Sequence, residues 1–468
     1  MSKPAQDLAF MSLTEAAALI RSGELSAVTY TQGLLDHIAA HDGQLDSFLR
    51  VLSDSALEEA AAADRAVKAG ETLGALHGVP FGLKDIVDVV GLPTTAHSQV
   101  LAQQPPKTGD AVVTERLRDA GGILLGKTAT HEFALGGPSF DLPWPPARNP
   151  WNRDRYPGGS SSGSGAAVAA GFVPMAIGTD TGGSVRNPAT ACGIVGMKPT
   201  YGRVSRRGVA PLSYSLDHVG PMTRTVADNA LMLNVLAGHD PDDPASADVP
   251  VSDYTAQLDA GVKGLRIGVI RHFHNRDMIA APEMAEALEA ALQVLQDLGA
   301  EVVEIETAPL AQYATCNRVI LLSEAYAIHR RWLAERPGDY GELFLERVLP
   351  GAFLTGGDYV DALRLSRKMT TDFNRTINDL DGVIAVSSMD AAFAIEDPDE
   401  NALKYPRQAR TPFNLTGNPA LAMPNGFDGD GMPLAMQIIG GNFAEAMIYR
   451  IAAAYEGATE WHKRRPPL

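Results

Sequence analysis

The chain has 468 residues, of which 45% are hydrophobic and 20% charged, an ordinary globular composition with ample material for a large core. Its net charge of −17 repels phosphate backbones and argues against direct nucleic-acid binding. Two cysteines, Cys192 and Cys316, cannot form a disulfide framework and fit a reducing compartment. We see neither a signal-peptide pattern nor a membrane span, and we expect a cytoplasmic protein.

Residues 1–70 are expected to be helical. Ser12 to Glu15 (SLTE) fits a capping box before an Ala/Leu-rich helix that ends near Gly23. A second helix is expected from Ser26 to His41, and a third from about Asp54 to Gly70. The signs of the charges near the ends of the third helix suit its dipole.

From Gly78 the pattern alternates between strand and helix. GVPFGLKDIVDVVGLP is apolar, β-prone and interrupted by Gly and Pro, which indicates strand and turn. Further along we expect a helix over Asp110–Ala120 and strands over Gly122–Lys127, Val173–Thr179 and Asp379–Ser387, as well as a strand–helix–strand unit over Leu265–Ile305. This alternation predicts an α/β fold. The Pro/Asp-rich stretch 239–252 is expected to be a surface loop that does not by itself prove a domain boundary.

Two glycine-rich segments are candidates for chemistry. Pro157 to Gly165 reads PGGSSSGSG, which is typical either of a flexible linker or of a loop that brings N–H groups and hydroxyls to a reacting group. Thr179 to Ser184 lie at the C-terminal end of a predicted strand, at the edge where ligands bind in α/β sheets. The adjacent Gly182 and Gly183 permit unusual backbone angles and an oxyanion hole, and the hydroxyl of Ser184 follows directly.

A serine nucleophile needs a base, and none of the eleven histidines lies in either segment. Lys84, in the apolar stretch GVPFGLKD, is the other candidate, although a lone lysine is more often a surface charge. To act as a base it must be neutral, which means disfavouring its charged form by about 5 kcal/mol. Burial at the end of an apolar strand produces shifts of that kind.

Three segments closely resemble the signature blocks of the amidase signature family. They are GVPFGLKD, PGGSSSGSGAAVAAG and GTDTGGSVRNPATACGIVGMKPTYGRVSRRG. Further likeness is carried by GGILLGKTATHEFALG, RNPWN, SLDHVGPMTRTVADNALML and FNLTGNPALAMPNGF. The resemblance is dense over 75–240, good over 410–455 and weak over 255–405. It implies one amidase signature domain over 1–468, with an N-terminal helical region (1–70), a catalytic core (75–240) and a divergent, substrate-shaping region (255–405). The implied fold is α/β, a large mixed sheet covered by helices on both faces.

The resemblance also implies a set of site residues. The family uses a nucleophilic serine, a relay serine preceded by a cis peptide bond, and a lysine base. By motif position, Ser184 resembles the nucleophile, Ser160 the relay and Lys84 the base. The oxyanion hole would be formed by the backbone N–H groups of Thr181, Gly182, Gly183 and Ser184. Supporting hydrogen bonds are expected from Ser161, Asp180 and Arg186. The segment Phe133–Pro146 faces substrate in the family, so Leu135, Gly136 and Gly137 are expected to bind substrate, and no metal or cofactor is expected.

Two functions fit this resemblance. The first is a hydrolase that cleaves the C–N bond of a small linear amide, with aryl amides, carbamates and esters as further substrates. The second is the ammonia-releasing A subunit of a glutamine-dependent tRNA amidotransferase, which the block GRVSRRG and its continuation resemble. Thr130-His131 replaces the Met-Asp usual in that protein, which favours the hydrolase. We expect a small-molecule substrate and no membrane partner. The sequence leaves the oligomeric state open, with a homodimer as one option.

Other interpretations of the same residues are weaker. The motif G-x-S-x-G in Gly159–Gly163 is preceded by polar residues rather than the strand of a nucleophile elbow, and a P-loop lysine is missing. Cys192 is more typical of a buried small residue than of a thiol nucleophile. His272 and His274 lack further ligands for a metal. Trp144 and Trp151 are expected to pack structurally, with an aromatic substrate pocket as the alternative.

Overall fold

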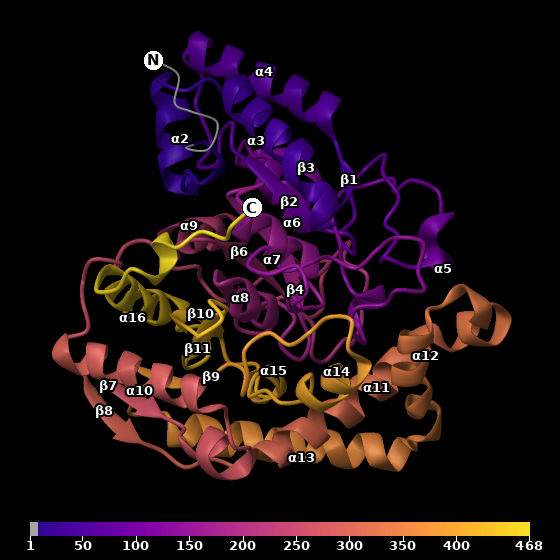
Figure 1. The fold of residues 1–468 in the computed structure, drawn as a ribbon, viewed down its shortest axis with the longest axis vertical. Coiled ribbons are helices and arrows are strands. Elements are labelled where there is room, and N and C mark those ends of the chain that lie inside the picture. Colours follow the sequence, from indigo (N-terminus) through magenta and orange to yellow (C-terminus); the bar gives the residue numbers. More distant parts are fainter. Residues whose placement is uncertain (1–7) are drawn as a thin grey trace.

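The computed structural model describes residues 8–468, and its centre is a mixed sheet of eleven strands within that range (Figure 1). The strand order is β1-β3-β2-β4-β6-β5-β10-β11-β9-β7-β8. The strands are β1 (Phe48–Val51), β2 (Pro80–Lys84), β3 (Ile123–Thr128), β4 (Met175–Asp180), β5 (Val195–Lys198), β6 (His218–Thr223), β7 (Arg266–Val269), β8 (Glu301–Glu304), β9 (Gly382–Val386), β10 (Ala420–Phe427) and β11 (Pro433–Ile439). β2 pairs in parallel with β3 and β4, and β7 with β8 and β9, whereas the other pairs are antiparallel. The predicted mixed sheet is confirmed.

Helices cover both faces of this sheet. They are α2 (Leu13–Ser22), α3 (Ala27–His41), α4 (Ser53–Ala69), α5 (Gln99–Ala102), α6 (Val112–Asp119), α7 (Ser162–Ala169), α8 (Arg186–Cys192), α9 (Val226–Leu236), α10 (Pro282–Asp297), α11 (Leu310–Glu335), α12 (Glu342–Val348), α13 (Gly356–Thr376), α14 (Pro398–Lys404), α15 (Thr411–Leu415) and α16 (Glu445–Gly457). Gly196 of β5 faces α8, whereas Gly382 of β9 faces α16. The strand pairing places these two glycines on opposite sides of the pleat, so α8 and α16 lie on opposite faces.

The helices expected in the N-terminal region are present, and the first two have serine N-caps. Ser12 accepts a hydrogen bond from the Glu15 N–H at the start of α2, and Gly23 ends the helix in a left-handed conformation. Ser26 caps α3 in the same way. The predicted strand–helix–strand unit is β7, α10 and β8. β7, β8 and β9, from residues 255–405, belong to the same sheet as the strands of residues 75–240.

Two boundaries differ from the sequence expectation. In GVPFGLKDIVDVVGLP only Pro80–Lys84 is a named strand, because the backbone turns directly after Lys84, where Ile86 and Val87 both donate to the Lys84 carbonyl oxygen. The small-residue helix α7 begins at Ser162, ahead of the alanines. Every residue of α7 is buried, so the serine-rich segment is part of the core and not a flexible linker.

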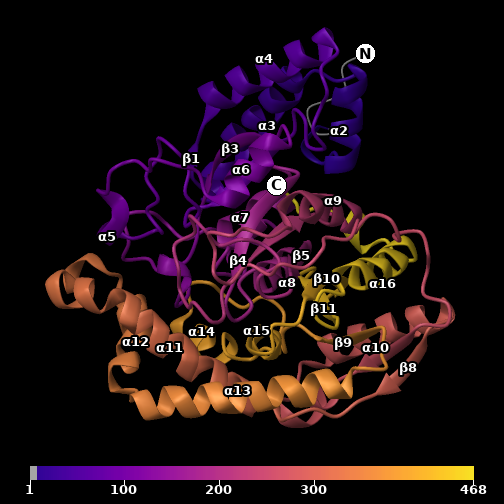
Figure 2. The same ribbon diagram turned by 180° about the vertical axis from the view of Figure 1, so that it is seen from behind.

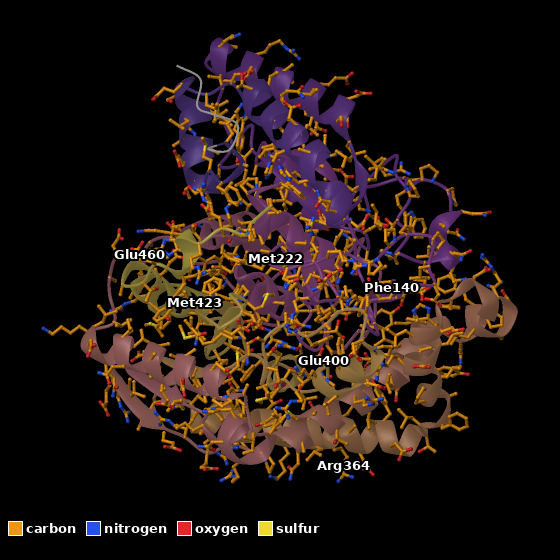
Figure 3. All side chains as sticks on the ribbon, viewed as in Figure 1. Phe140, Met222, Arg364, Glu400, Met423 and Glu460 are labelled. Carbon is orange, nitrogen blue, oxygen red and sulfur yellow. The ribbon has the colours of Figure 1, made fainter. Side chains whose placement is uncertain are left out.

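The longest helices form one wall of the molecule that the sequence did not indicate. α11 and α13 contact each other along the edge drawn in orange (Figures 1 and 2). Figure 3 shows Arg364 on the outer side of α13, whereas Met222 and Met423 lie among the central elements. Within residues 8–468, no helix is both long and apolar enough to cross a membrane.

Candidate active site

Lys84 is the last residue of β2 and is fully buried. Its Nζ donates hydrogen bonds to Ser160 Oγ at 2.7 Å and to Thr179 Oγ1 at 2.8 Å. Burial lowers the pKa of Lys84 to about 7, although the charges of Asp217 and Asp180 act in the opposite direction. The amine is therefore poised to exchange a proton near neutral pH, which is the requirement for a lysine base.

The loop that carries Ser160 is held tightly by its neighbours. The peptide bond Gly159–Ser160 is cis. A Cβ at Gly158 would lie 2.3 Å from Pro188, and one at Gly159 would lie 2.1 Å from the ring of His131. The His131 N–H donates to the Ser160 carbonyl oxygen at 3.0 Å. Only glycine fits these two positions, so the loop has one close-packed path past the end of β2.

Ser161 joins this loop to β4 and to the turn that follows it. Its Oγ accepts from the Thr179 N–H at 3.1 Å and donates to the Thr179 carbonyl oxygen at 3.2 Å. Its own N–H donates to the Ser184 carbonyl oxygen at 3.2 Å. Ser162 is buried in the first turn of α7. The segments carrying Ser160 and Ser184 are thus fastened directly to each other.

Ser184 lies in the turn between β4 and α8 and is half-buried. Its hydroxyl forms no hydrogen bond within the described part of the chain, and Ser184 lines a cavity. The Gly183 N–H donates to Asp180 Oδ1 at 2.8 Å, so this amide already has an acceptor. The N–H groups of Thr181, Gly182 and Ser184 have no acceptor among residues 8–468. Three of the four amides expected in an oxyanion hole are therefore available.

Asp180 and Arg186 brace this turn from within. Both are fully buried, and Arg186 donates from Nε and Nη2 to the two carboxylate oxygens of Asp180 at 3.0 Å each. Burial raises the pKa of Asp180, but the charge and hydrogen bonds of Arg186 outweigh burial, and the net pKa is well below its usual range. Arg186 also donates to Asn414 and Gln437, which ties the turn to α15 and β11.

The cavity beside Ser184 has a volume of about 230 Å³. Leu135 and Gly136 line it, whereas Gly137 lines a separate small cavity with His131, which Ser184 does not line. A second cavity of about 760 Å³ shares Ala134, Thr181 and Leu212 with the first and reaches Asp217, Asp242 and Asp243.

Three contacts of the site were not anticipated from the sequence. Thr179 is the second partner of the Lys84 amine, and strand alternation at the end of β4 was the available signal. Asn317 of α11 donates to the Thr181 carbonyl oxygen, and Arg410 lies against Gly183. No local motif marks Asn317 or Arg410, because each reaches the site from a distant part of the chain.

The remaining candidates have structural surroundings. Cys192 is buried and donates to the Pro157 carbonyl oxygen, and burial raises the pKa of its thiol far above the usual range. His272 bonds to Asp277 and Thr307, and residues 8–468 contain no group of three or more His, Cys, Asp or Glu that could hold a metal. Trp151 donates to the Cys192 carbonyl oxygen and packs on Phe427.

Comparison with known proteins identifies the family. The amidase family model matches residues 29–449. The A subunit of glutamyl-tRNA(Gln) amidotransferase from Chloroflexus aggregans is 40% identical over 489 aligned positions, covering 99% of each chain. Among solved structures, peptide amidase from Stenotrophomonas maltophilia superposes with a TM-score of 0.88 at 32% identity, covering 99% of each chain. The amidotransferase A subunit from Thermotoga maritima superposes with a TM-score of 0.77 at 32% identity, covering 97% of this chain and 94% of that one. This chain belongs to the amidase family.

Proposed function

We propose that the chain cleaves the C–N bond of a small amide through a covalent acyl-enzyme formed on Ser184. The observation that carries this proposal is the buried Lys84 amine, which lies 2.7 Å from Ser160 Oγ and has a pKa of about 7. Neutral Lys84 takes the proton of Ser160, Ser160 takes that of Ser184, and the Ser184 oxygen attacks the amide carbonyl. The Lys84 amine contacts two hydroxyls, those of Ser160 and Thr179. We assign the relay to Ser160 because it holds the position of the relay serine in the amidase signature blocks.

The tetrahedral oxyanion is assigned to the amides of the turn after β4. Thr181, Gly182 and Ser184 have N–H groups without an acceptor among residues 8–468, whereas the Gly183 N–H is bonded to Asp180. We assign the oxyanion hole to the first three and a bracing role to the fourth. The C–N bond then breaks, the proton returns through Ser160 to the departing nitrogen, and water releases the acyl group by the same path in reverse.

The comparisons favour ammonia release over the cleavage of aryl amides, carbamates or esters. Relatives matching nearly the whole chain at 38 to 40% identity are named as the A subunit of glutamyl-tRNA(Gln) amidotransferase. We propose by this likeness that a primary amide is the substrate class, glutamine being the substrate if the chain works as such a subunit. In that role it requires partner subunits, as the name of these relatives implies.

A stand-alone amidase is the second candidate, and two observations favour it. The peptide amidase superposes over the full chain with a higher TM-score than the solved amidotransferase component. His131 is fully buried, packs on Gly159 and is stacked on Tyr156. An aspartate in its place, as is usual in the amidotransferase, would bring a charge into this buried contact.

A direct experiment separates these outcomes. The purified chain is assayed for ammonia or amine release from glutamine, small primary amides, aryl amides and aryl carbamates. Activity on glutamine that appears only with co-expressed partner subunits supports the amidotransferase role, whereas turnover by the chain alone supports the amidase. Phenylmethylsulfonyl fluoride is expected to label Ser184, with Ser184→Ala as the unlabelled control. Labelling at another serine, or turnover by Ser184→Ala, rejects the proposed chemistry.

A further inference from the structure

Arg410 is a buried arginine without a carboxylate partner. It directly precedes α15, and only 4% of its surface is exposed. Its Nη1 donates to the Ser387 carbonyl oxygen and to Ser388 Oγ, but its Nε is buried and has no acceptor. Among residues 8–468 no acidic side chain forms an ion pair with it. A guanidinium withdrawn from water without an opposite charge is costly, and such sites are usually completed by an anion.

The nearest acidic group is already committed. Asp180 is bound by the guanidinium of Arg186 through both oxygens, so it cannot also neutralise Arg410. Burial and the charge of Arg186 lower the pKa of Arg410 to about 10, which leaves it charged at neutral pH. Together, Arg410, Arg186 and Asp180 carry one net positive charge.

This unpaired charge lies beside the nucleophile. A Cβ built on Gly183, the residue before Ser184, would lie 2.6 Å from Arg410 Nε. Arg410 and Ser184 also line the same cavity of about 230 Å³. A group that contacts the guanidinium from within this cavity is therefore only a short distance from the carbonyl that Ser184 attacks.

Two further arginines line the same cavity. Arg318 of α11 and Arg347 of α12 line it together with Arg410, and no Asp or Glu does. Neither forms an ion pair within the described part of the chain, and Arg347 Nε is buried without an acceptor. Three unpaired arginines in one small cavity contrast with a chain whose net charge is −17. Such a cavity attracts and orients anions.

We propose that the substrate is an amide that also carries a carboxylate, and that Arg410 binds this carboxylate while Ser184 attacks the amide. Arg318 and Arg347 line the same cavity and add to its attraction for anions. The inference rests on the proposed function and names its substrate class. A free α-ammonium group would find no acidic partner in this cavity, because the nearby aspartates line the adjoining one. Monoamides of dicarboxylic acids therefore fit better than glutamine, which carries both charges.

The experiment compares matched substrates. The monoamides of malonic, succinic and glutaric acid are assayed beside propionamide, butyramide and valeramide, and beside glutamine. The carboxylate of the best monoamide is expected to raise kcat/KM about 10- to 100-fold over its neutral counterpart, the range typical of a charge-assisted hydrogen-bonded pair. Arg410→Gln is expected to abolish that ratio and Arg410→Lys to retain part of it. Arg364→Gln, which changes an exposed arginine on α13, is the control and keeps the ratio.

Binding tests the anion site without turnover. Glutarate and succinate, titrated calorimetrically into the wild-type chain, are expected to bind and to compete with the monoamides, whereas glutaramide and succinamide bind more weakly. Equal kcat/KM for charged and neutral amides, or no preference for the dicarboxylates, overturns the inference. If no amide is cleaved and phenylmethylsulfonyl fluoride leaves Ser184 unlabelled, the proposed function fails, but the titration still decides whether the cavity binds carboxylates.

Discussion

The backbone N–H of Ser161 donates a hydrogen bond to the carbonyl oxygen of Ser184 at 3.2 Å. This bond connects two segments that lie on different loops, one before α7 and one before α8. The spacing between Ser160, the proposed relay, and Ser184, the proposed nucleophile, is therefore set by main-chain contact as well as by the side chains.

Ser161→Ala is expected to lower kcat by about 10- to 100-fold, because small displacements of catalytic groups have effects of that size. The substitution removes both Oγ bonds to Thr179 but keeps the main-chain bond to Ser184. Steady-state kinetics and circular dichroism check it. Ser55→Ala, at an exposed helical position, is the matched control. An unchanged kcat would contradict the positioning role.

The rate should depend on pH through Lys84. Because the base must be neutral and its pKa is about 7, kcat/KM is expected to be high above pH 7 and to fall as pH drops through that value. Lys84→Ala is expected to lose about 10²- to 10⁴-fold in kcat. A pH–rate profile that spans about two pH units on either side of this pKa measures the acid limb. A flat acid limb argues against a lysine base.

Lys84 should also affect stability in a pH-dependent way. Its pKa in the folded chain is below the unfolded value, so the unfolded state binds more protons between about pH 7 and 10 and stability rises with pH across that window. Lys84→Met is therefore expected to stabilise the fold at pH 7 and below by on the order of 5 kcal/mol, and by less towards pH 10. Urea unfolding at pH 6, 8 and 10 measures whether the difference in unfolding free energy between Lys84→Met and the wild type becomes smaller as pH rises. A constant difference would contradict it.

Asp180→Asn should destabilise the fold by about 3 to 5 kcal/mol, because it leaves the buried Arg186 without its counter-charge. It also removes the anionic acceptor of the Gly183 N–H, so kcat is expected to fall. Asp361→Asn breaks an exposed ion pair on α13 and serves as the control, with unfolding unchanged within error. Equal effects of the two substitutions would contradict the bracing role.

Gly163→Ala tests how closely the serine-rich segment is packed. A Cβ there would lie 2.2 Å from the Ser47 carbonyl oxygen, so something must shift, and both folded yield and kcat are expected to drop. Gly109→Ala places a methyl group in open space and is the control. Thermal unfolding and kinetics of the two variants are compared. Wild-type behaviour of Gly163→Ala would show that the loop tolerates displacement.

Much of the fold followed from local sequence signals. The caps at Ser12 and Ser26 and the apolar strands before Lys84 and Ser184 are short-range patterns, and the structure has the elements they predict. Lys84, Ser160 and Ser184 could be chosen together because each lies in a distinctive block. The parallel pairing of β2 with β4 brings the segments that carry Lys84 and Ser184 side by side, and the sequence alone does not display that pairing.

The rest of the site depends on contacts between residues that are far apart in the sequence. Arg410 reaches Gly183 from a segment with no chemical motif, and Asn317 arrives from the middle of α11, in the region where family likeness is weak. The sequence also did not indicate that the Asp180 carboxylate accepts the N–H of Gly183, one of the four amides expected in the oxyanion hole. Whether an N–H faces a nearby carboxylate or the oxyanion of a substrate depends on three-dimensional geometry, which residue spacing does not reveal.

Helices α11 and α12 supply part of the wall of the cavity beside Ser184. Asn317, Arg318, Leu321, Leu322 and Arg347 all come from the stretch 310–376, whereas the proton-relay residues come from earlier strands and loops. Leu135 and Arg410 line the same cavity from outside this stretch, so residues 310–376 form one wall of the cavity and not the whole of it. Chimaeras that exchange this stretch between relatives should therefore alter the preference among amides of different shape, while the Lys84–Ser160 contact and the carboxylate contact proposed for Arg410 stay in place.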